Sequence, residues 1–247
     1  MQNKSSLEIT DKIFFEDKDF NLNKVQSIVS KSLEGSDDGE LYLESTKSES
    51  FSFDDGRMRS VSYDSTQGFG LRAIADEAKG FAHSGELTEE SLNRASETVK
   101  SVSKNYSGTM AEAPSHGINK PLYTSINPLE ETSFQIKTNL LEEIDSYARS
   151  LDPRVVQVSA SLSASYQAIQ ILRANGERSA DIRPLVRLNV AIVVEQNGRR
   201  ETGSSGCGGR GKYEEWINKE KWQSQVKEAL RIGSINLESV PLSLIHI

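Results

Sequence analysis

Cysteine is almost absent from this sequence, with Cys207 as the single example among 247 residues. One cysteine cannot form an internal disulfide, and nothing here points to an oxidising compartment. Histidine is also scarce, and His83, His116 and His246 show no paired spacing with Cys207 of the kind that holds a metal ion. The sequence therefore offers neither a disulfide framework nor a recognisable set of metal ligands.

Long apolar runs are missing as well. The stretch from Met1 to Phe20 is polar and acidic, without the basic segment and apolar core that mark a secretory signal. No later run approaches the roughly 18 apolar residues that a membrane span needs. We expect a soluble, untargeted protein of the reducing cytoplasm that does not contact a membrane.

A basic stripe is the third absence. The chain carries 29 Lys and Arg against 36 Asp and Glu, a net charge of -7, and both signs are interspersed. Nucleic acids attract clustered positive charge, so a direct nucleic-acid partner is not expected. The apolar residues, 36% of the chain, gather in periodic segments, which predicts a folded protein of one large or, preferably, two ordinary domains.

The first half of the chain predicts helices around a set of strands. Apolar residues recur at helical spacing from Leu22 to Leu33, and Thr88 is a good N-cap for a helix reaching about Tyr106. Asp54-Asp55-Gly56 suits a hairpin turn, and Lys79-Gly80 is a second expected turn. Strand-like alternation is expected around residues 41–43, 51–53, 58–63, 69–73 and 81–83.

The second half predicts a long helix and an antiparallel meander. The helix runs from about Glu130 to Ser150, with Phe134, Ile136, Leu140, Leu141, Ile144, Tyr147 and Leu151 as its apolar face and Asp152-Pro153 as its end. Strands are expected at 155–166, 168–174, 185–194 and 199–202, with turns at Asn175-Gly176 and Asn197-Gly198. A final helix carries Trp216, Trp222, Val226, Ala229, Leu230 and Ile232.

We therefore expect an α+β protein of antiparallel sheets with flanking helices in two domains, the second of them incomplete. The N-terminal domain covers residues 1–110, a connection bearing proline and glycine covers 111–128, and the second domain covers 129–241. Residues 242–247 form an apolar tail that continues no period, which suggests a truncation or a non-native end.

The glycine-rich run from Gly203 to Gly211 allows two interpretations. Gly206 to Lys212 fits the first seven positions of a phosphate-binding loop, but Tyr213 stands where a small hydroxyl should bind magnesium. An antiparallel meander is also the wrong context for such a loop. We favour a glycine-rich strand end at which another backbone approaches closely, which would also let an extended peptide lie alongside.

The remaining polar candidates favour structural roles. Cys207 is expected to be a buried or half-buried thiol, and none of the three histidines looks like a ligand. The adjacent pairs Glu89-Glu90 and Glu142-Glu143 suit solvent-exposed helix faces. The segment from Asp181 to Arg187 could clamp a substrate carboxylate or pin a turn by ion pairing, and we favour the second.

Three stretches resemble the TldD/PmbA family of zinc-dependent peptidase subunits, some described as modulators of DNA gyrase. Thr66 to Ile74, followed by Gly80-Phe81-Ala82, resembles the family's N-terminal strand pair and its Gly-Phe-Ala signature. Asp181 to Leu188 and Arg200 to Arg210 are similar to the TldD branch. The likeness extends from about Leu22 to Pro241.

The resemblance implies a cytosolic metallopeptidase in which a TldD-type subunit carries zinc and a PmbA-like (TldE-like) partner completes a chamber for unfolded or extended peptides. The family's zinc site uses a His-Glu-x-x-x-His helix and a distant cysteine. This sequence has no such motif, and Cys207 does not stand in for the family's cysteine. No catalytic, cofactor-binding or metal-binding residue is therefore assigned.

We expect the chain to be the N-terminal part of such a subunit, with zinc bound only by the full-length protein and no catalysis by this chain alone. Two alternatives stay open at this point. One is a peptide- or protein-interaction module that works without a metal, and the other is a phosphate or nucleotide binder that uses the glycine run.

Overall fold

Alternating apolar and polar residues form strands that are much longer than the short apolar segments of the sequence suggest. The computed structural model describes residues 5–16, 19–101 and 122–240. One six-stranded sheet has the strand order β3-β2-β1-β4-β5-β6. The strands are β1 (Asp38–Asp54), β2 (Arg57–Ala75), β3 (Ala78–Ser84), β4 (Val155–Arg173), β5 (Arg178–Gln196) and β6 (Arg199–Gly209). The α+β class and the antiparallel pairing are confirmed, and the strands expected in separate sheets belong to one.

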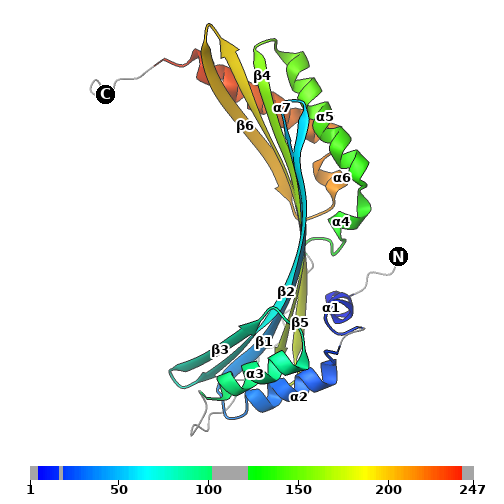
Figure 1. Ribbon diagram of the computed structural model, residues 1–247, viewed down its shortest axis with the longest axis vertical. Coiled ribbons are helices and arrows are strands. Elements are labelled where there is room, and N and C mark those ends of the chain that lie inside the picture. Colours follow the sequence, from blue (N-terminus) through cyan, green and yellow to red (C-terminus); the bar gives the residue numbers. More distant parts are fainter. Residues whose placement is uncertain (1–4, 17–18, 102–121, 241–247) are drawn as a thin grey trace, which may run out of the picture. The chain divides into compact units, whose positions relative to one another are not determined.

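The helices lie before, between and after these strands in the sequence (Figure 1). They are α1 (Ser6–Phe14), α2 (Leu22–Ser32), α3 (Glu89–Lys100), α4 (Pro128–Glu131), α5 (Phe134–Leu151), α6 (Tyr213–Trp216) and α7 (Lys219–Glu238). The chain divides into two compact units. The first comprises Met1–Lys47, Ser65–Ser125 and Gln167–Arg183, and the second comprises Ser48–Asp64, Ile126–Tyr166 and Pro184–Ile247.

The first unit packs α2 and α3 over the strands that it contains. Val25, Val29, Leu92 and Val99 are fully buried, and the Ser32 hydroxyl donates to the Ser96 hydroxyl at 2.6 Å between the two helices. Helix α2 confirms the helix expected from Leu22. The helix expected from Thr88 is confirmed as far as Lys100, and its last residues, to Tyr106, lie outside the described residues.

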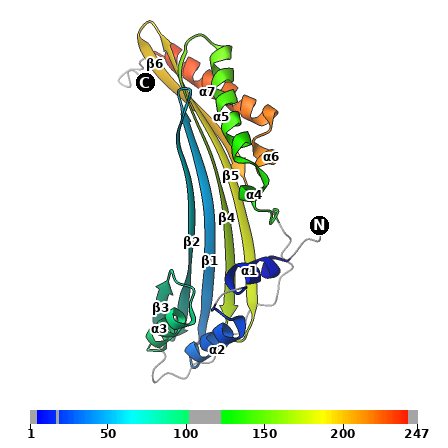
Figure 2. The same ribbon diagram turned by 45° about the vertical axis from the view of Figure 1, so that its right-hand side comes forward.

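The second unit is built around α5 and α7. Figures 1 and 2 show both helices on one face of the sheet in this unit, and the core between them and the strands includes Leu141, Ile144, Leu162, Leu188 and Val226. Helix α5 ends at Leu151 before an extended Asp152, as expected from Asp152-Pro153. The long helix and the meander of β4, β5 and β6 are thus confirmed.

The apolar face expected for α5 is wrong in its first turn. Phe134 is 58% exposed and Ile136 56% exposed, whereas Lys137 is buried at 2%. Lys137 stands at helical spacing from the buried Leu140, Leu141 and Ile144, and it can be buried because its charge is paired inside the unit. Leu151, at 39% exposed, also lies outside the buried face.

The turns between neighbouring strands lie at residues with positive φ angles. Asp55 and Gly56 have φ values of 50° and 75°, and Asn197 and Gly198 have 54° and 80°, so these two expected turns are confirmed. The turn expected at Asn175-Gly176 is confirmed as well, with a φ of 83° at Gly176 between β4 and β5. The turn expected at Lys79-Gly80 is wrong, because both residues lie in β3. The chain reverses instead at Asp76, whose φ is 54° and whose backbone N–H donates to the Asp37 carboxylate at 2.7 Å.

Several expectations remain untested. The connection at 111–128 lies largely outside the described residues, as do His116, His246 and the tail at 242–247. The division into domains of 1–110 and 129–241 stays a prediction. Each compact unit takes three separate segments, because β1, β2, β4 and β5 each contribute one end to either unit.

Candidate binding groove on the helix-free face of the second unit

The strand β4 sorts its side chains by alternation in the second unit. Val158, Ala160, Leu162 and Ala164 are buried toward α5 and α7. The intervening Ser159, Ser161, Ser163 and Ser165 point to the opposite face, because successive strand residues alternate between faces. That face carries no described helix in this unit (Figure 2) and is rich in hydroxyl groups.

A groove of about 830 Å³ lies on this helix-free face. It is lined by Ser52, Phe53, Asp54, Arg59, Ser159, Ala160, Ser161, Arg187, Asn189, Val190, Ala191, Ser204, Ser205 and Gly206. A smaller pocket of about 250 Å³ lies on the same unit and includes Ser163, Ser165, Asp64 and Arg187. Arg187 lines both hollows, so it is the cation that the two share.

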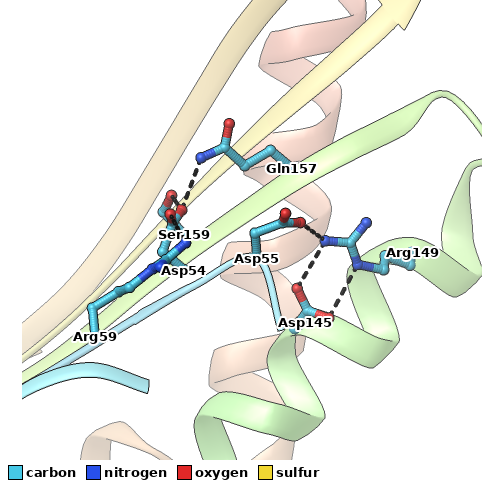
Figure 3. A network of polar contacts seen from close by, with 7 residues as sticks. All are labelled: Asp54, Asp55, Arg59, Asp145, Arg149, Gln157 and Ser159. Carbon is cyan, nitrogen blue, oxygen red and sulfur yellow. Dashed lines mark hydrogen bonds and ion pairs between the residues drawn. The ribbon is translucent and has the colours of Figure 1, made fainter. Parts of the chain in front are cut away.

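The Asp54 carboxylate at the groove wall is already engaged (Figure 3). It accepts hydrogen bonds from the Ser159 hydroxyl at 2.6 Å, from Gln157 Nε2 at 2.9 Å and from Arg59 Nη2 at 3.3 Å. The Ser159 hydrogen bond is the main reason that the pKa of Asp54 falls below its ordinary value, followed by that of Gln157. Asp54 is therefore a structural carboxylate that joins β1, β2 and β4.

The tip of the β1–β2 hairpin is tied to α5 by a second set of contacts (Figure 3). Arg149 Nη2 lies 2.5 Å from the Asp55 carboxylate, and Arg149 Nε donates to Asp145 at 3.1 Å. The hydrogen bond to Asp145 is the main cause that raises the pKa of Arg149. These contacts hold the hairpin against the helix layer, so they support one end of the groove.

A buried ion pair lies on the opposite, helix-covered side of the unit. Lys137 Nζ lies 2.5 Å from Glu49 Oε1, and the Tyr213 hydroxyl donates to the same oxygen at 2.6 Å. Lys137 also lies 4.8 Å from the centre of the Tyr213 ring. Burial, together with the Glu49 hydrogen bond, raises the pKa of Tyr213, so its hydroxyl remains a donor. This cluster was not predicted from the sequence, although Lys137 stands at helical spacing from the buried Leu140, Leu141 and Ile144.

The glycine run forms the strand β6, which confirms the close-approach interpretation. A Cβ at Gly203 would lie 2.0 Å from the Ala229 carbonyl oxygen and 2.2 Å from the Gly233 nitrogen, so only glycine lets α7 approach here. Gly206, Gly208 and Gly209 lie in the extended strand β6. Gly206 pairs with Asn189 of β5, and Gly208 pairs with Arg187. The phosphate-loop interpretation is wrong, because these glycines are extended rather than wrapped into a loop.

The other singled-out residues are dispersed over the two units. Cys207 is half-buried, as expected, its thiol donates to the Trp216 carbonyl at 3.6 Å, and burial raises its pKa. His83 is exposed on β3 of the first unit, 5.8 Å from the Phe81 ring centre. Glu89 and Glu90 bind Lys24 and Arg94 at the surface, and Glu142 and Glu143 are exposed.

The segment from Asp181 to Arg187 is split between the units. In the first unit Asp181 binds Arg183 at 2.6 Å and accepts the Tyr123 hydroxyl at 3.0 Å, which agrees with the structural interpretation of these residues. The hydrogen bond to Asp181 is the main cause that raises the pKa of Arg183. Arg187 belongs to the second unit and takes no part in this pairing.

Metal ligands are not gathered in the part of the chain that the structure describes. No group of three or more His, Cys, Asp or Glu residues there is arranged to hold an ion. The described residues thus do not fit a zinc site, and no catalytic step is derived through one. Among the described helices, none is both long and apolar enough to cross a membrane.

Comparison with known protein families gives two matches. Residues 127–237 match the family described as PmbA/TldA metallopeptidase central domain, and residues 39–103 match PmbA/TldA metallopeptidase domain 1. Among curated proteins, the chain is 35% identical over 209 residues to a metalloprotease TldD homolog of Buchnera aphidicola and 36% identical over 210 residues to one of Haemophilus influenzae. These alignments cover 82% and 83% of the chain but only 43% and 44% of the relatives.

Solved structures share the fold. A candidate modulator of a DNA gyrase from Thermotoga maritima superposes with a TM-score of 0.72 at 14% identity, over 90% of this chain and 49% of that one. TldE from Thermococcus kodakarensis gives 0.66 at 17% identity, over 85% and 46%. The chain spans less than half the length of the curated relatives that it matches. On these matches, the chain belongs to the TldD/PmbA family of metallopeptidases.

Proposed function

We propose that this chain is the substrate-holding part of a TldD-like zinc metallopeptidase that processes unfolded or extended peptides in the cytoplasm. The observation that carries the proposal is the match to domain 1 and the central domain of the family, together with 35% identity to a TldD homolog. In the full-length protein, zinc would polarise the scissile carbonyl and activate water. Its histidine ligands and glutamate base belong to a segment that this sequence does not contain, so the chain alone binds without cleaving.

The groove supports a peptide-holding role. An extended peptide can add to the edge strand β6, since β6 stands at the end of the strand order and its glycines leave the backbone accessible. Alternate peptide side chains would then lie on the helix-free face, beside the hydroxyl group of Ser204 on β6. Small hydroxyl groups accommodate many side chains, which suits a broad range of peptides.

A PmbA-like (TldE-like) subunit is the proposed partner. The support is the shared fold with TldE and the family match, both of which concern the architecture of this chain. Neither a nucleic acid nor a membrane is part of the proposal. The alternative function, a metal-independent interaction module, would use the same groove and differs only in lacking any hydrolytic step.

The proposal can be tested with fluorescently labelled extended peptides and the purified chain. We expect saturable binding that Ser204→Trp abolishes, because Ser204 is exposed on the helix-free face and a bulky ring there fills the groove. Glu142→Trp on the outer side of α5 is the matched control and should bind as the parent does. Equal binding by both variants would refute the groove as the peptide site.

The metal-dependent step needs its own experiment. Joining the chain to the remaining sequence of its natural protein should yield zinc binding and cleavage of the same peptides. If the joined protein binds peptides without zinc and never cleaves them, the interaction-module alternative is supported instead.

A further inference from the structure

Arg187 differs from the other cation of the groove in its partners. Arg59 is paired with Asp54 at 3.3 Å, whereas Arg187 makes no ion pair within residues 5–16, 19–101 and 122–240. The Arg187 side chain is exposed, and its Nε donates to Asn189 Oδ1 at 2.9 Å. Within the same described ranges, neither Nη1 nor Nη2 has a hydrogen-bond partner.

The glycines of β6 give this side chain its room. Arg187 is opposite Gly208 and Asn189 is opposite Gly206 in the β5–β6 register. A Cβ at Gly206 would lie 2.6 Å from Asn189 Oδ1 and 3.3 Å from Arg187 Nη2, and one at Gly208 would lie 3.2 Å from Arg187 Cδ. Arg187 therefore extends across β6, through the space that side chains would fill, toward the sheet edge.

Asn189 holds the guanidinium in a defined orientation. Its Nδ2 donates to the Ser161 hydroxyl at 3.4 Å, which directs Oδ1 toward Arg187 Nε. The two Nη groups are left to face the groove. A planar guanidinium with two unused parallel N–H donors matches the geometry of a carboxylate.

The neighbouring acids do not compete for this cation in the structure. Asp54 is engaged by Ser159, Gln157 and Arg59, and Glu49 is turned to Lys137 and Tyr213. Asp64 lines the smaller pocket with Arg187 but lies beyond ion-pair distance from it. The unpaired charge that the groove wall offers to a ligand is therefore positive.

We propose that Arg187, oriented by Asn189, is a specificity-determining residue that binds a carboxylate of the extended peptide. The inference rests on the proposed function, because a peptide added to β6 places every second side chain on the face that Arg187 crosses. The carboxylate can come from an acidic side chain or from the peptide's C-terminus. Arg187 thereby sets the register in which a bound peptide lies along the strand.

The test compares three labelled peptides of one sequence by equilibrium binding. One carries a single Glu and an amidated C-terminus, one carries Gln at that position with the amide, and one carries Gln with a free C-terminal carboxylate. Charged hydrogen bonds contribute about 1.5–3 kcal/mol, so the carboxylate peptide should bind roughly 10- to 150-fold more tightly than the neutral one. Which carboxylate peptide gains affinity identifies the source.

Variants test whether Arg187 itself, and not the groove as a whole, causes the preference for a carboxylate. Arg187→Gln should reduce the affinity for the carboxylate peptide to that for the neutral peptide, and Arg187→Lys should retain part of the difference. Arg200→Gln, at an arginine of the neighbouring strand β6 that is exposed and does not line the groove, should keep the full difference. Thermal melts of each variant verify that the fold is unchanged.

Two results overturn the inference in distinguishable ways. If peptides bind but the acidic and neutral ones bind equally, or if Arg187→Gln weakens all of them alike, the carboxylate anchor is refuted while the proposed function stands. If no peptide binds the parent chain, the proposed function fails and the anchor fails with it.

Discussion

At the scale of single residues, Lys137 shows how a charge can occupy a core position. It is 2% exposed, and its Nζ is paired with Glu49, which also receives the Tyr213 hydroxyl. Burying a charge is costly unless it is paired and hydrogen-bonded, and removing one partner leaves the other uncompensated. The cluster joins β1, α5 and α6 and lies beneath the groove face, so its loss should lower the free energy of unfolding.

Lys137→Ala should lower the free energy of unfolding by roughly 3–5 kcal/mol, because Glu49 is left buried with only Tyr213 as a partner. The measurement is urea denaturation near neutral pH. Lys24→Ala is the matched control, since Lys24 is 67% exposed in its pair with Glu89 and should cost less than about 1 kcal/mol. Similar losses for both lysines would contradict a buried, paired role for Lys137.

Tyr166 predicts an alkaline limit to stability. It is 9% exposed, and burial raises its pKa from 10.0 to about 12. The unfolded chain then releases this proton at a lower pH than the native protein does. The stabilising contribution is complete below pH 10 and is lost as pH rises from there toward 12.

Tyr166→Phe should therefore lose less stability than the parent between pH 8 and 11, by up to about 1.4 kcal/mol for each pH unit above the unfolded pKa. Urea midpoints at the two pH values provide the measurement. Tyr63→Phe, at an exposed position, is the control and should follow the parent. A Tyr166→Phe curve that parallels the parent would show that this hydroxyl titrates as it does in the unfolded chain.

At the scale of elements, the contact between β6 and α7 depends on a single missing side chain. Gly203→Ala places a Cβ 2.0 Å from the Ala229 carbonyl oxygen, which is backbone and cannot rotate away. Overpacking of this kind typically costs about 1–3 kcal/mol, occasionally more. We expect a loss at or above that range in thermal or urea unfolding.

The control for this substitution is Gly85→Ala. The nearest atom to a Cβ at Gly85 is the Gln67 carbonyl oxygen at 3.7 Å, an ordinary contact, so the change should stay within about 0.5 kcal/mol. A Gly203→Ala variant as stable as the Gly85→Ala variant would mean that α7 does not approach β6 this closely.

Elements with strong local signals could be predicted from the sequence. The turns at Asp55-Gly56 and Asn197-Gly198 follow from residues that tolerate positive φ, and α2 follows from its apolar spacing. Helix α1 was missed although Ser5 and Glu8 form a capping box, because the polar composition of the first residues hid it. The turn at Asp76 could not be foreseen, since it is held by a long-range hydrogen bond that the Asp76 backbone N–H donates to the Asp37 carboxylate.

The strands were predicted as short pieces because hydrophobic alternation was the only signal used. Residues 44–50 of β1 are all polar, yet the chain stays extended through them. Polar residues can remain in a strand when neighbouring strands supply the backbone hydrogen bonds, and such pairing is not visible in a local pattern. The same limit explains why Arg187 and Asn189 were not linked to Gly208 and Gly206, their partners in the β5–β6 register.

At the scale of the whole molecule, the chain combines a hydroxyl-rich groove, a glycine edge strand and membership of a metallopeptidase family. It matches domain 1 and the central domain of that family and spans less than half of its curated relatives. Binding and hydrolysis are therefore expected to separate. The chain should hold an extended peptide, and a segment that it does not contain should supply the zinc ligands.

The most direct test of this account is backbone-amide NMR of the chain titrated with an extended peptide, with zinc content and peptide integrity measured on the same sample. The account predicts that shifts change along β6 and around Ser159, Ser161 and Arg187, while the peptide stays intact and zinc is not held stoichiometrically. Shift changes confined to the helix-covered side, or tightly held zinc with cleavage of the peptide, would contradict it.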